Sequence, residues 1–189
     1  MEVMRQRPKI VVLGGGFGGL ETAFYLRFRL GGRVSITLVS DKDYFLFKPN
    51  TIYIPFGMDP ERLKIPLQRP ARRIEVDFVQ AAAREIDPAQ GRVHADGQVL
   101  SYDYLVVATG AGMRVEEVPG LAEHAYTIWT PEEMLRLRTA FQDLLKKARA
   151  GQRREVLFLV PPNNKCSGPL YEIVFMLDTW LRRHGVRDA

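Results

Sequence analysis

The sequence predicts an α/β fold class, a protein built around a parallel β-sheet, and three neighbouring segments support this prediction. Residues 9–13 form a short, continuously apolar run rich in β-branched side chains, as expected of a strand covered on both faces. Residues 20–30 carry apolar side chains at helical spacing, and Gly31-Gly32 ends the pattern. Residues 34–39 repeat the composition of the first run. A strand, a helix and a strand within about thirty residues make one β-α-β unit, the building block of a Rossmann-like domain.

Further strands are expected in the rest of this first domain. Asp96-Gly97 separates two short runs and favours a tight turn with positive φ, so the pair predicts an antiparallel hairpin within a β-meander. Residues 44–56 are rich in aromatic residues and prolines and have no steady period, which predicts a loop with short helical pieces. The expected strands are residues 76–79, 92–95, 98–100 and 104–108. We therefore expect a Rossmann-like domain with a parallel sheet and a β-meander over residues 1–125.

A long helix is expected after residue 129. Thr130 can serve as its N-cap, Pro131 as its first helical residue and Glu133 as the reciprocal partner of a capping box. Apolar residues then continue at helical spacing to Ala148.

The last part of the chain predicts the beginning of a second domain, over residues 126–189. Residues 155–160 have the composition of a strand, and a helical pattern follows from about residue 170 to residue 183. One strand and one helix cannot close a parallel sheet, because the return strand of a β-α-β unit is missing. We therefore expect a second Rossmann-like domain that is incomplete: either the chain is truncated, or its last ~35 residues, the length of one such unit, pack on another chain.

The composition excludes several classes of protein. The formal net charge is +5, but the basic residues are dispersed and form no basic helix, so nucleic acid is not an expected partner. His94, His124 and His184 lack metal-ligand spacing, so no metal is expected. The single cysteine, Cys166, rules out an internal disulfide framework and fits a reducing compartment. No run approaches the ~18 apolar residues of a spanning helix. A cytoplasmic location is expected, with peripheral membrane contact left open.

Three glycines carry the strongest functional signal. Gly14, Gly16 and Gly19 fit the pattern G-x-G-x-x-G directly after a strand and at the start of a helix. In such a turn the first glycine permits the tight bend, the second lets the backbone approach a pyrophosphate, and the third lets helix and strand pack closely. The positive end of the helix dipole then faces the phosphates. The pattern predicts dinucleotide binding; the alternative is a glycine turn with a purely structural role.

The end of the second strand should contact a ribose, usually through an acidic residue. Here Ser40 and Asp41 follow Val39. Either Ser40 occupies the usual acidic position with Asp41 beside it, or the strand register differs by one residue. A strand-to-loop turn made of small polar residues remains the alternative.

The chain resembles the pyridine-nucleotide-disulfide-oxidoreductase-like flavoproteins over nearly its whole length. The resemblance rests on residues 14–19 (GGGFGG), on the Asp96-Gly97 hairpin and on residues 102–110 (YDYLVVATG), which look like the family's second flavin-domain signature. It implies that FAD, rather than NAD, binds at the N-terminal turn. The cofactor-binding residues expected from the motif and the resemblance together are Gly14, Gly16, Phe17, Gly19, Ser40, Asp41, Lys42, Pro49, Ala81, Thr109 and Gly110.

The distribution of cysteine and glycine narrows the subfamily. Residues 44–49 contain no cysteine, which excludes the dithiol reductases and the single-cysteine branch that carry their redox-active sulfur there. Residues 161–169 (PPNNKCSGP) follow the expected second-domain strand without a second glycine turn, so we expect the pyridine-nucleotide site to be lost. A cysteine in this loop, followed by Gly-Pro, is similar to sulfide:quinone oxidoreductases and to the flavoprotein subunit of flavocytochrome c sulfide dehydrogenases.

That resemblance implies an enzyme in which Cys166 is catalytic and takes up sulfur from sulfide, while electrons pass to FAD and then to quinone or a cytochrome. A thiol near a helix N-terminus and beside Lys165 is favoured as the nucleophilic thiolate. A lone cysteine is otherwise an inert, buried small hydrophobe. The partner cysteine and the region that would seat the protein on a membrane are not in these residues. Two alternatives stay open: a type II NADH:quinone reductase-like flavoprotein, and a truncated, non-catalytic flavin-fold fragment.

Overall fold

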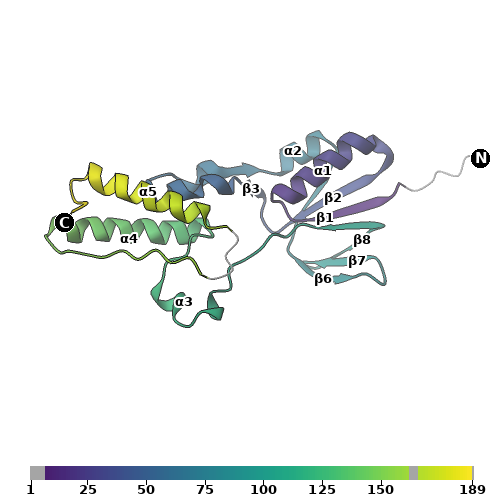
Figure 1. The fold of residues 1–189 in the computed structure, drawn as a ribbon. Coiled ribbons are helices and arrows are strands. Elements are labelled where there is room, and N and C mark those ends of the chain that lie inside the picture. Colours follow the sequence, from purple (N-terminus) through teal and green to yellow (C-terminus); the bar gives the residue numbers. More distant parts are fainter. Residues whose placement is uncertain (1–6, 162–165, 189) are drawn as a thin grey trace, which may run out of the picture. The chain divides into compact units, whose positions relative to one another are not determined.

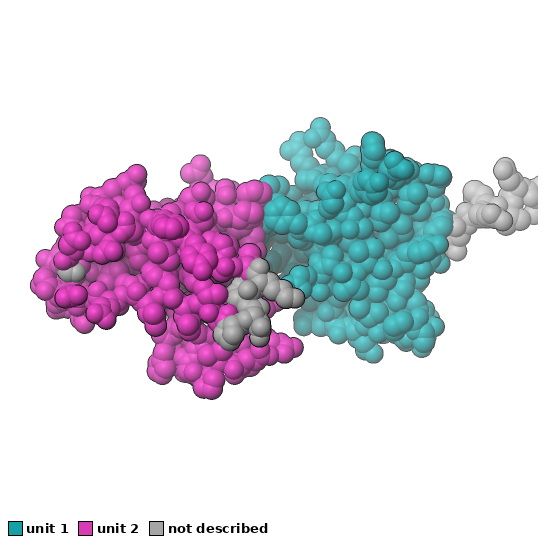
Figure 2. All heavy atoms as spheres, in the orientation of Figure 1, with its two compact units in different colours: residues 1–46, 64–111 teal, residues 47–63, 112–189 magenta. Residues whose placement is uncertain are grey.

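The computed structural model describes residues 7–161 and 166–188. Their contacts divide them into two compact units, each described separately below (Figure 2). Unit 1 comprises the described residues of 1–46 and 64–111, and unit 2 those of 47–63 and 112–189. The chain therefore leaves unit 1 after Leu46 and returns to it at Lys64.

Unit 1 is built on a four-stranded sheet in which every neighbouring pair is parallel, as the sequence predicts (Figure 1). The strand order is β5-β2-β1-β9, so that β1 lies in the interior and β9 at one edge. The strands are β1 (Lys9–Leu13), β2 (Ser35–Ser40), β5 (Asp77–Gln80) and β9 (Tyr104–Val107). Each begins and ends within one residue of its prediction, and β1 and β2, which are mostly buried, carry the clearest apolar runs.

Alternate residues of β1 serve two separate cores. Ile10 and Val12 pack with helix α1 (Phe17–Leu30) and with Ala71 of helix α2 (Gln68–Arg73), which cover one face of the sheet (Figure 1). Val11 and Leu13 point to the opposite face and pack with the second sheet of unit 1. Since successive side chains of a strand point to opposite faces, both faces of β1 are buried, which explains its uninterrupted apolar composition.

The second sheet of unit 1 is an antiparallel meander that contains the predicted hairpin. Its strands are β6 (Ala83–Asp87), β7 (Arg92–Ala95) and β8 (Gln98–Ser101). Asp96 and Gly97 form the turn with φ values of 33° and 81°, the positive φ that this pair favours. The sequence did not predict β6, because its residues are charged and largely exposed and therefore carry little apolar signal.

Two short strands flank the point where the chain leaves and re-enters unit 1. They are β3 (Tyr44–Leu46) and β4 (Lys64–Pro66), which pair antiparallel. Between them lie two 3-10 helices, η2 (Lys48–Phe56) and η3 (Pro60–Leu63). The expected short helical pieces are thus confirmed, whereas the β3–β4 pair was not foreseen, since three residues are too few to show a period.

Unit 2 consists mainly of helices packed around η2. They are α4 (Pro131–Arg149) and α5 (Gly168–Arg183), with a short 3-10 helix η4 (Val115–Glu117) and a short helix α3 (Leu121–His124). Arg138 of α4 donates hydrogen bonds to the backbone oxygens of Ile54, at 2.7 Å, and Met58. The ring of Phe141 lies 5.5 Å from that of Phe56 and 6.4 Å from that of Trp180. These contacts connect η2, α4 and α5.

The strand predicted over residues 155–160 is not formed, so this prediction is wrong. The segment has no regular secondary structure, and the side chains of Leu157 and Leu159 are 87% and 58% exposed. A strand needs a neighbour to accept and donate its backbone hydrogen bonds. The described part of unit 2 supplies no such strand, so the apolar composition alone does not produce one.

The capping box predicted at the start of α4 is present. The Thr130 hydroxyl accepts the N–H of Glu133 at 3.2 Å, and the Glu133 carboxylate accepts the N–H of Thr130 at 3.1 Å. We expect Thr130→Ala to lower the free energy of unfolding of unit 2 by about 1 kcal/mol, because a helix N–H loses its partner. Urea unfolding followed by circular dichroism measures the effect. The matched control is Thr139→Ala in the same helix, which removes an exposed hydroxyl outside the cap; equal losses for both variants would contradict the role of the cap.

Candidate functional site

The glycine turn lies at the carboxyl end of β1, and two of its glycines are required by the packing of unit 1. Gly14 has φ of 112°, and its N–H donates to the Val39 oxygen at 2.8 Å. A Cβ on Gly14 would lie 2.7 Å from the carbonyl carbon of Ala108 and closer still to its oxygen. A Cβ on Gly19 would overlap the carbonyl oxygen of Gly14. Neither position has room for a side chain.

Gly16 differs from these two glycines because the space beside it is open. A Cβ built on Gly16 would meet no atom within 4 Å, and its φ of −87° is allowed to any residue. Gly16 is the N-cap of α1, and no acidic residue occupies the first turn of that helix. The first N–H groups of a helix have no partner within the helix and carry its positive partial charge. Open space beside such a helix end suits a phosphate group, so the cradle fits the pyrophosphate of a dinucleotide.

A fourth glycine, which the sequence analysis did not single out, shapes the same turn. A Cβ on Gly15 would lie 2.7 Å from the Ser40 hydroxyl oxygen and 2.8 Å from a methyl group of Leu67. Ser40 is the last residue of β2 and is buried. The signal in the sequence is the run of three successive glycines, because the motif itself requires only the first and third of them.

The end of β2 places three of the expected cofactor-binding residues next to the turn. Val39 pairs with Leu13 across the sheet, so Ser40 is the first residue beyond the last residue of β1. The Ser40 hydroxyl oxygen accepts the N–H of Lys42 at 3.3 Å, an interaction typical of a tight turn after a strand. The side chains of Asp41 and Lys42 are exposed and accessible to a ligand.

The neighbouring strands bring the remaining expected residues of unit 1 to the same edge. Ala81 follows β5, is buried, and donates its N–H to the Ser40 oxygen at 2.8 Å. Thr109 and Gly110 follow β9 and are exposed, and Gly110 has φ of 81°. Because all four strands are parallel, their carboxyl ends lie at one edge of the sheet, which is where open α/β sheets bind ligands.

Asp96 in the hairpin turn fixes the loop that follows Ala81. Its carboxylate accepts the N–H of Ala82 at 2.7 Å and the Nε–H of Arg84 at 2.8 Å. The backbone hydrogen bond from Ala82 and, secondly, the hydrogen bond from Arg84 lower the pKa of Asp96 below its ordinary value. The Asp-Gly pair therefore has a second role beyond the turn itself, since its carboxylate holds the loop next to the candidate site.

Pro49 and Cys166 both lie in unit 2. Pro49 is exposed in the first turn of η2. Cys166 is exposed and lies two residues before the first residue of α5. Lys165, expected to promote the thiolate of Cys166, lies outside the described residues. In unit 1, Phe17 at the start of α1 packs edge-on against Phe45, with ring centroids 4.8 Å apart.

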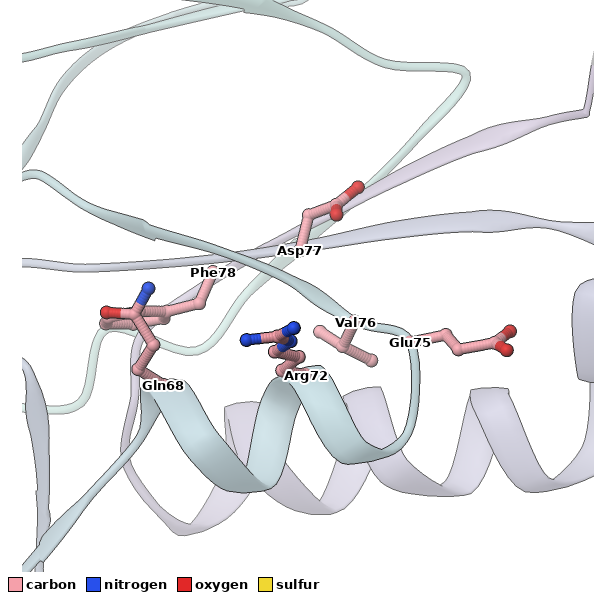
Figure 3. A pocket seen from close by; sticks show the side chains of 6 residues that line it. All are labelled: Gln68, Arg72, Glu75, Val76, Asp77 and Phe78. Atoms are coloured by element: carbon pink, nitrogen blue, oxygen red, sulfur yellow. The ribbon is translucent and has the colours of Figure 1, made fainter.

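A pocket elsewhere in unit 1 is separate from the cluster. Figure 3 shows it between α2 and the first residues of β5. Its lining residues are Gln68, Arg72, Glu75, Val76, Asp77 and Phe78. Val76 and Asp77 are at the amino end of β5, whereas the glycine turn lies at the carboxyl end of β1.

Among the residues that the structure describes, no group of three or more His, Cys, Asp or Glu could hold a metal ion, and no helix is long and apolar enough to cross a membrane.

Comparison with known protein families shows the family to which the chain belongs. Residues 8–151 match the family model described as pyridine nucleotide-disulphide oxidoreductase. The chain belongs to this family. The match contains the glycine turn, the meander and residues 102–110, which are the features on which the sequence resemblance rests. Members of the pyridine nucleotide-disulphide oxidoreductase family are FAD-dependent oxidoreductases, so the family and the fold class expected from the sequence are confirmed.

The chain is similar to two relatives and to one solved structure of this family. It is 35% identical over 180 residues to a sulfide-quinone reductase from Aquifex aeolicus (strain VF5), which covers 94% of this chain and 40% of that protein. The solved sulfide:quinone oxidoreductase of Aquifex aeolicus superposes with a TM-score of 0.82 at 32% identity, over 95% of this chain and 41% of that one. A type II NADH:quinone oxidoreductase from Staphylococcus epidermidis is 32% identical over 66% of this chain and 31% of its own length. The chain thus spans well under half of these relatives.

Proposed function

We propose that the turn of residues 14–19 binds the pyrophosphate of FAD. The observation that carries this proposal is the contrast between the glycines. Packing against the protein itself accounts for Gly14 and Gly19, whereas no protein atom explains the absence of a side chain at Gly16. A ligand that must approach the backbone closely explains it, and the N-terminus of α1 supplies N–H groups and positive potential for an anion.

The remaining residues at the carboxyl edge have roles that follow from their positions. The exposed carboxylate of Asp41, which follows β2, can hydrogen-bond the hydroxyls of a ribose, with the buried hydroxyl of Ser40 beside it. Lys42 offers a cation close to the phosphates, and Ala81 presents a small side chain and a backbone held against β2. Thr109 and Gly110 offer backbone groups after β9, where Gly110 allows the chain to turn with positive φ. Pro49 contributes backbone near the flavin in this proposal.

The domain boundary expected at residue 126 stays a prediction.

We further infer that the protein is part of an FAD-dependent oxidoreductase that oxidises sulfide and transfers electrons to quinone or to a cytochrome. FAD, when bound, would accept the electrons of the sulfur substrate and pass them on. The similarity to sulfide-quinone reductases over nearly the whole chain supports this substrate. Residues 161–169 contain a cysteine in place of a second glycine turn, which favours a sulfur substrate over a pyridine nucleotide. Because quinones are dissolved in membranes, the proposal includes peripheral contact of a cytoplasmic protein with the membrane.

Oxidation of NADH with transfer to quinone is the second candidate, because NADH:quinone oxidoreductases are also among the relatives. An anaerobic titration distinguishes the two. The protein loaded with FAD is titrated with sulfide and, separately, with NADH, and the visible absorbance of the flavin is followed. Bleaching by sulfide supports sulfide oxidation, and bleaching by NADH alone overturns it. If the protein retains no flavin at all, a non-catalytic flavin-fold fragment is the better description.

The substitution Gly16→Ala should separate cofactor binding from folding. Its Cβ meets no protein atom and its backbone is relaxed, so we expect the free energy of unfolding to change by no more than about 0.5 kcal/mol. The methyl group would occupy the place of a phosphate oxygen, and we expect the dissociation constant for FAD to rise by about tenfold or more. Calorimetric titration with FAD measures the effect.

Gly32→Ala is the matched control for this variant. Gly32 lies in unit 1, also has open space where a Cβ would be, and has no positive φ. It should leave FAD binding unchanged. Unchanged FAD affinity in Gly16→Ala would argue against a pyrophosphate at this turn, since the added methyl group has no other neighbour to disturb.

A further inference from the structure

A two-residue link joins the two sheets of unit 1 at the carboxyl edge of the parallel sheet. It consists of Ala81 and Ala82, which lie between β5 and β6. Ala81 is buried, and its N–H is bonded to the backbone oxygen of Ser40 at the end of β2. The N–H of Ala82 instead donates to the carboxylate of Asp96 at 2.7 Å. The conformation of the link therefore depends on a side chain fourteen positions further along the chain.

The hairpin turn by itself does not require the carboxylate of Asp96. The φ of Asp96 is 33°, and asparagine or glycine is at least as well suited to the first position of such a turn. A second feature of the meander is directed at this carboxylate. The pairing of β6 with β7 shifts register between Ala83 and Glu85, so Arg84 is the extra residue of a bulge. Its Nε–H reaches the Asp96 carboxylate at 2.8 Å.

The position of the link along the sheet edge relates it to one part of the proposed cofactor. β1, β2 and β5 are successive neighbours in the sheet. The proposed pyrophosphate lies at the end of β1 and the proposed ribose contact at the end of β2. Neighbouring strands are about 4.8 Å apart, and the adenosine half of FAD continues from phosphate through ribose to adenine. The adenine would therefore reach the end of β5, where Ala81 and Ala82 lie.

We propose that Asp96 is a positioning residue for the adenosine half of FAD, because it holds the backbone of Ala82 in the conformation against which the adenine lies. Asp96 acts through Ala82 and needs no contact with the cofactor. A link that is already ordered in the free protein binds a base without the loss of conformational freedom that a mobile link would suffer. This inference rests on the proposed binding of FAD at residues 14–19, and every contact that supports it lies within unit 1.

The substitution Asp96→Gly tests the proposal, because it removes the carboxylate and leaves a residue that suits a positive φ. We expect the dissociation constant for FAD, measured by calorimetric titration, to rise by about fivefold or more. ADP contains the pyrophosphate and the adenosine without the flavin, so its dissociation constant should rise by the same factor. Asp96→Asn keeps an oxygen that can accept the N–H of Ala82 and should bind FAD within about twofold of the parent protein.

Asp87→Gly is the matched control in the same meander. The Asp87 carboxylate, at the end of β6 remote from Ala83, accepts the N–H of Gln90 at 3.0 Å. This variant loses the same kind of hydrogen bond and should bind FAD as the parent protein does. Hydrogen exchange without FAD provides an independent measurement. The amide of Ala82 should be protected in the parent protein and in Asp87→Gly, and should exchange rapidly in Asp96→Gly.

Several results would overturn the role of Asp96. They are parental FAD affinity or parental exchange of the Ala82 amide in Asp96→Gly, equal weakening of FAD binding by Asp87→Gly, and a loss of FAD affinity that ADP does not share. A parent protein that binds neither FAD nor ADP would overturn the proposed cofactor turn together with this inference. FAD binding that Gly16→Ala weakens and Asp96→Gly leaves unchanged would overturn this inference alone.

Discussion

Substitution of Gly14 by alanine is expected to lower the free energy of unfolding of unit 1 by about 4 kcal/mol or more. Two effects add at this position. The φ of 112° is strained for any residue with a Cβ, and that Cβ would overlap the carbonyl group of Ala108. Neither side can move away cheaply, because the Gly14 N–H is bonded to Val39 and the Ala108 N–H to Leu13, each at 2.8 Å. The new methyl group would therefore force apart β1, β2 and β9.

Urea unfolding of Gly14→Ala measures this loss of stability. Hydrogen exchange of the β1 and β9 amides, followed in the same experiment, assigns the loss to unit 1 rather than to the whole chain. Gly16→Ala is the internal comparison, since the two positions belong to one motif but differ in the space around them. Gly14→Ala should lose stability with or without FAD. If both alanine variants unfold at the same urea concentration as the parent protein, the packing argument for the turn is wrong.

The success of prediction from sequence differs between the two units for a physical reason. In unit 1, β1 and β2 are mostly buried by segments of the same chain, and each is consequently a largely apolar run whose limits can be located from composition. The segment of residues 155–160 has the same composition but no neighbouring strand among the described residues, and it remains irregular. The amino-acid composition of a segment indicates whether the segment can be buried. A strand also needs a neighbouring strand that forms hydrogen bonds with its backbone.

The candidate site shows a similar limit. The motif predicts which glycines matter and assigns their roles by analogy with other proteins. Only the packing shows that a side chain at Gly15 would come too close to Ser40, and that a side chain at Gly16 would meet no protein atom. The sequence alone can indicate that Ser40, Ala81 and Gly110 lie at one edge of the sheet, because the carboxyl ends of parallel strands lie at the same edge. The hydrogen bond from Ala82 to Asp96 joins residues fourteen positions apart, and no local pattern indicated it. The roles of all these residues toward FAD stay predictions.

Cys166→Ala is expected to slow the reduction of bound flavin by sulfide by a factor on the order of 10² or more, if the protein oxidises sulfide as proposed. Cys166 is the only cysteine of the chain, so no other thiol in these residues can form a sulfur–sulfur bond with sulfide, a step in which FAD, when bound, would take up the two electrons and the proton of HS⁻. Its exposure before α5 gives a small anion access. Anaerobic stopped-flow absorbance of the flavin measures the rate.

The control for Cys166→Ala is Ser167→Ala, the adjacent residue. Ser167 is the N-cap of α5, but its side chain makes no capping hydrogen bond, so its loss should disturb neither the helix nor the reaction. FAD affinity should equal that of the parent protein in both variants, because the proposed pyrophosphate site at the glycine turn does not use either side chain. A Cys166→Ala variant that is still reduced by sulfide at the parental rate would remove the cysteine from the mechanism. Reduction by NADH in both variants, without reduction by sulfide in either, would instead place this chain with the NADH:quinone oxidoreductases.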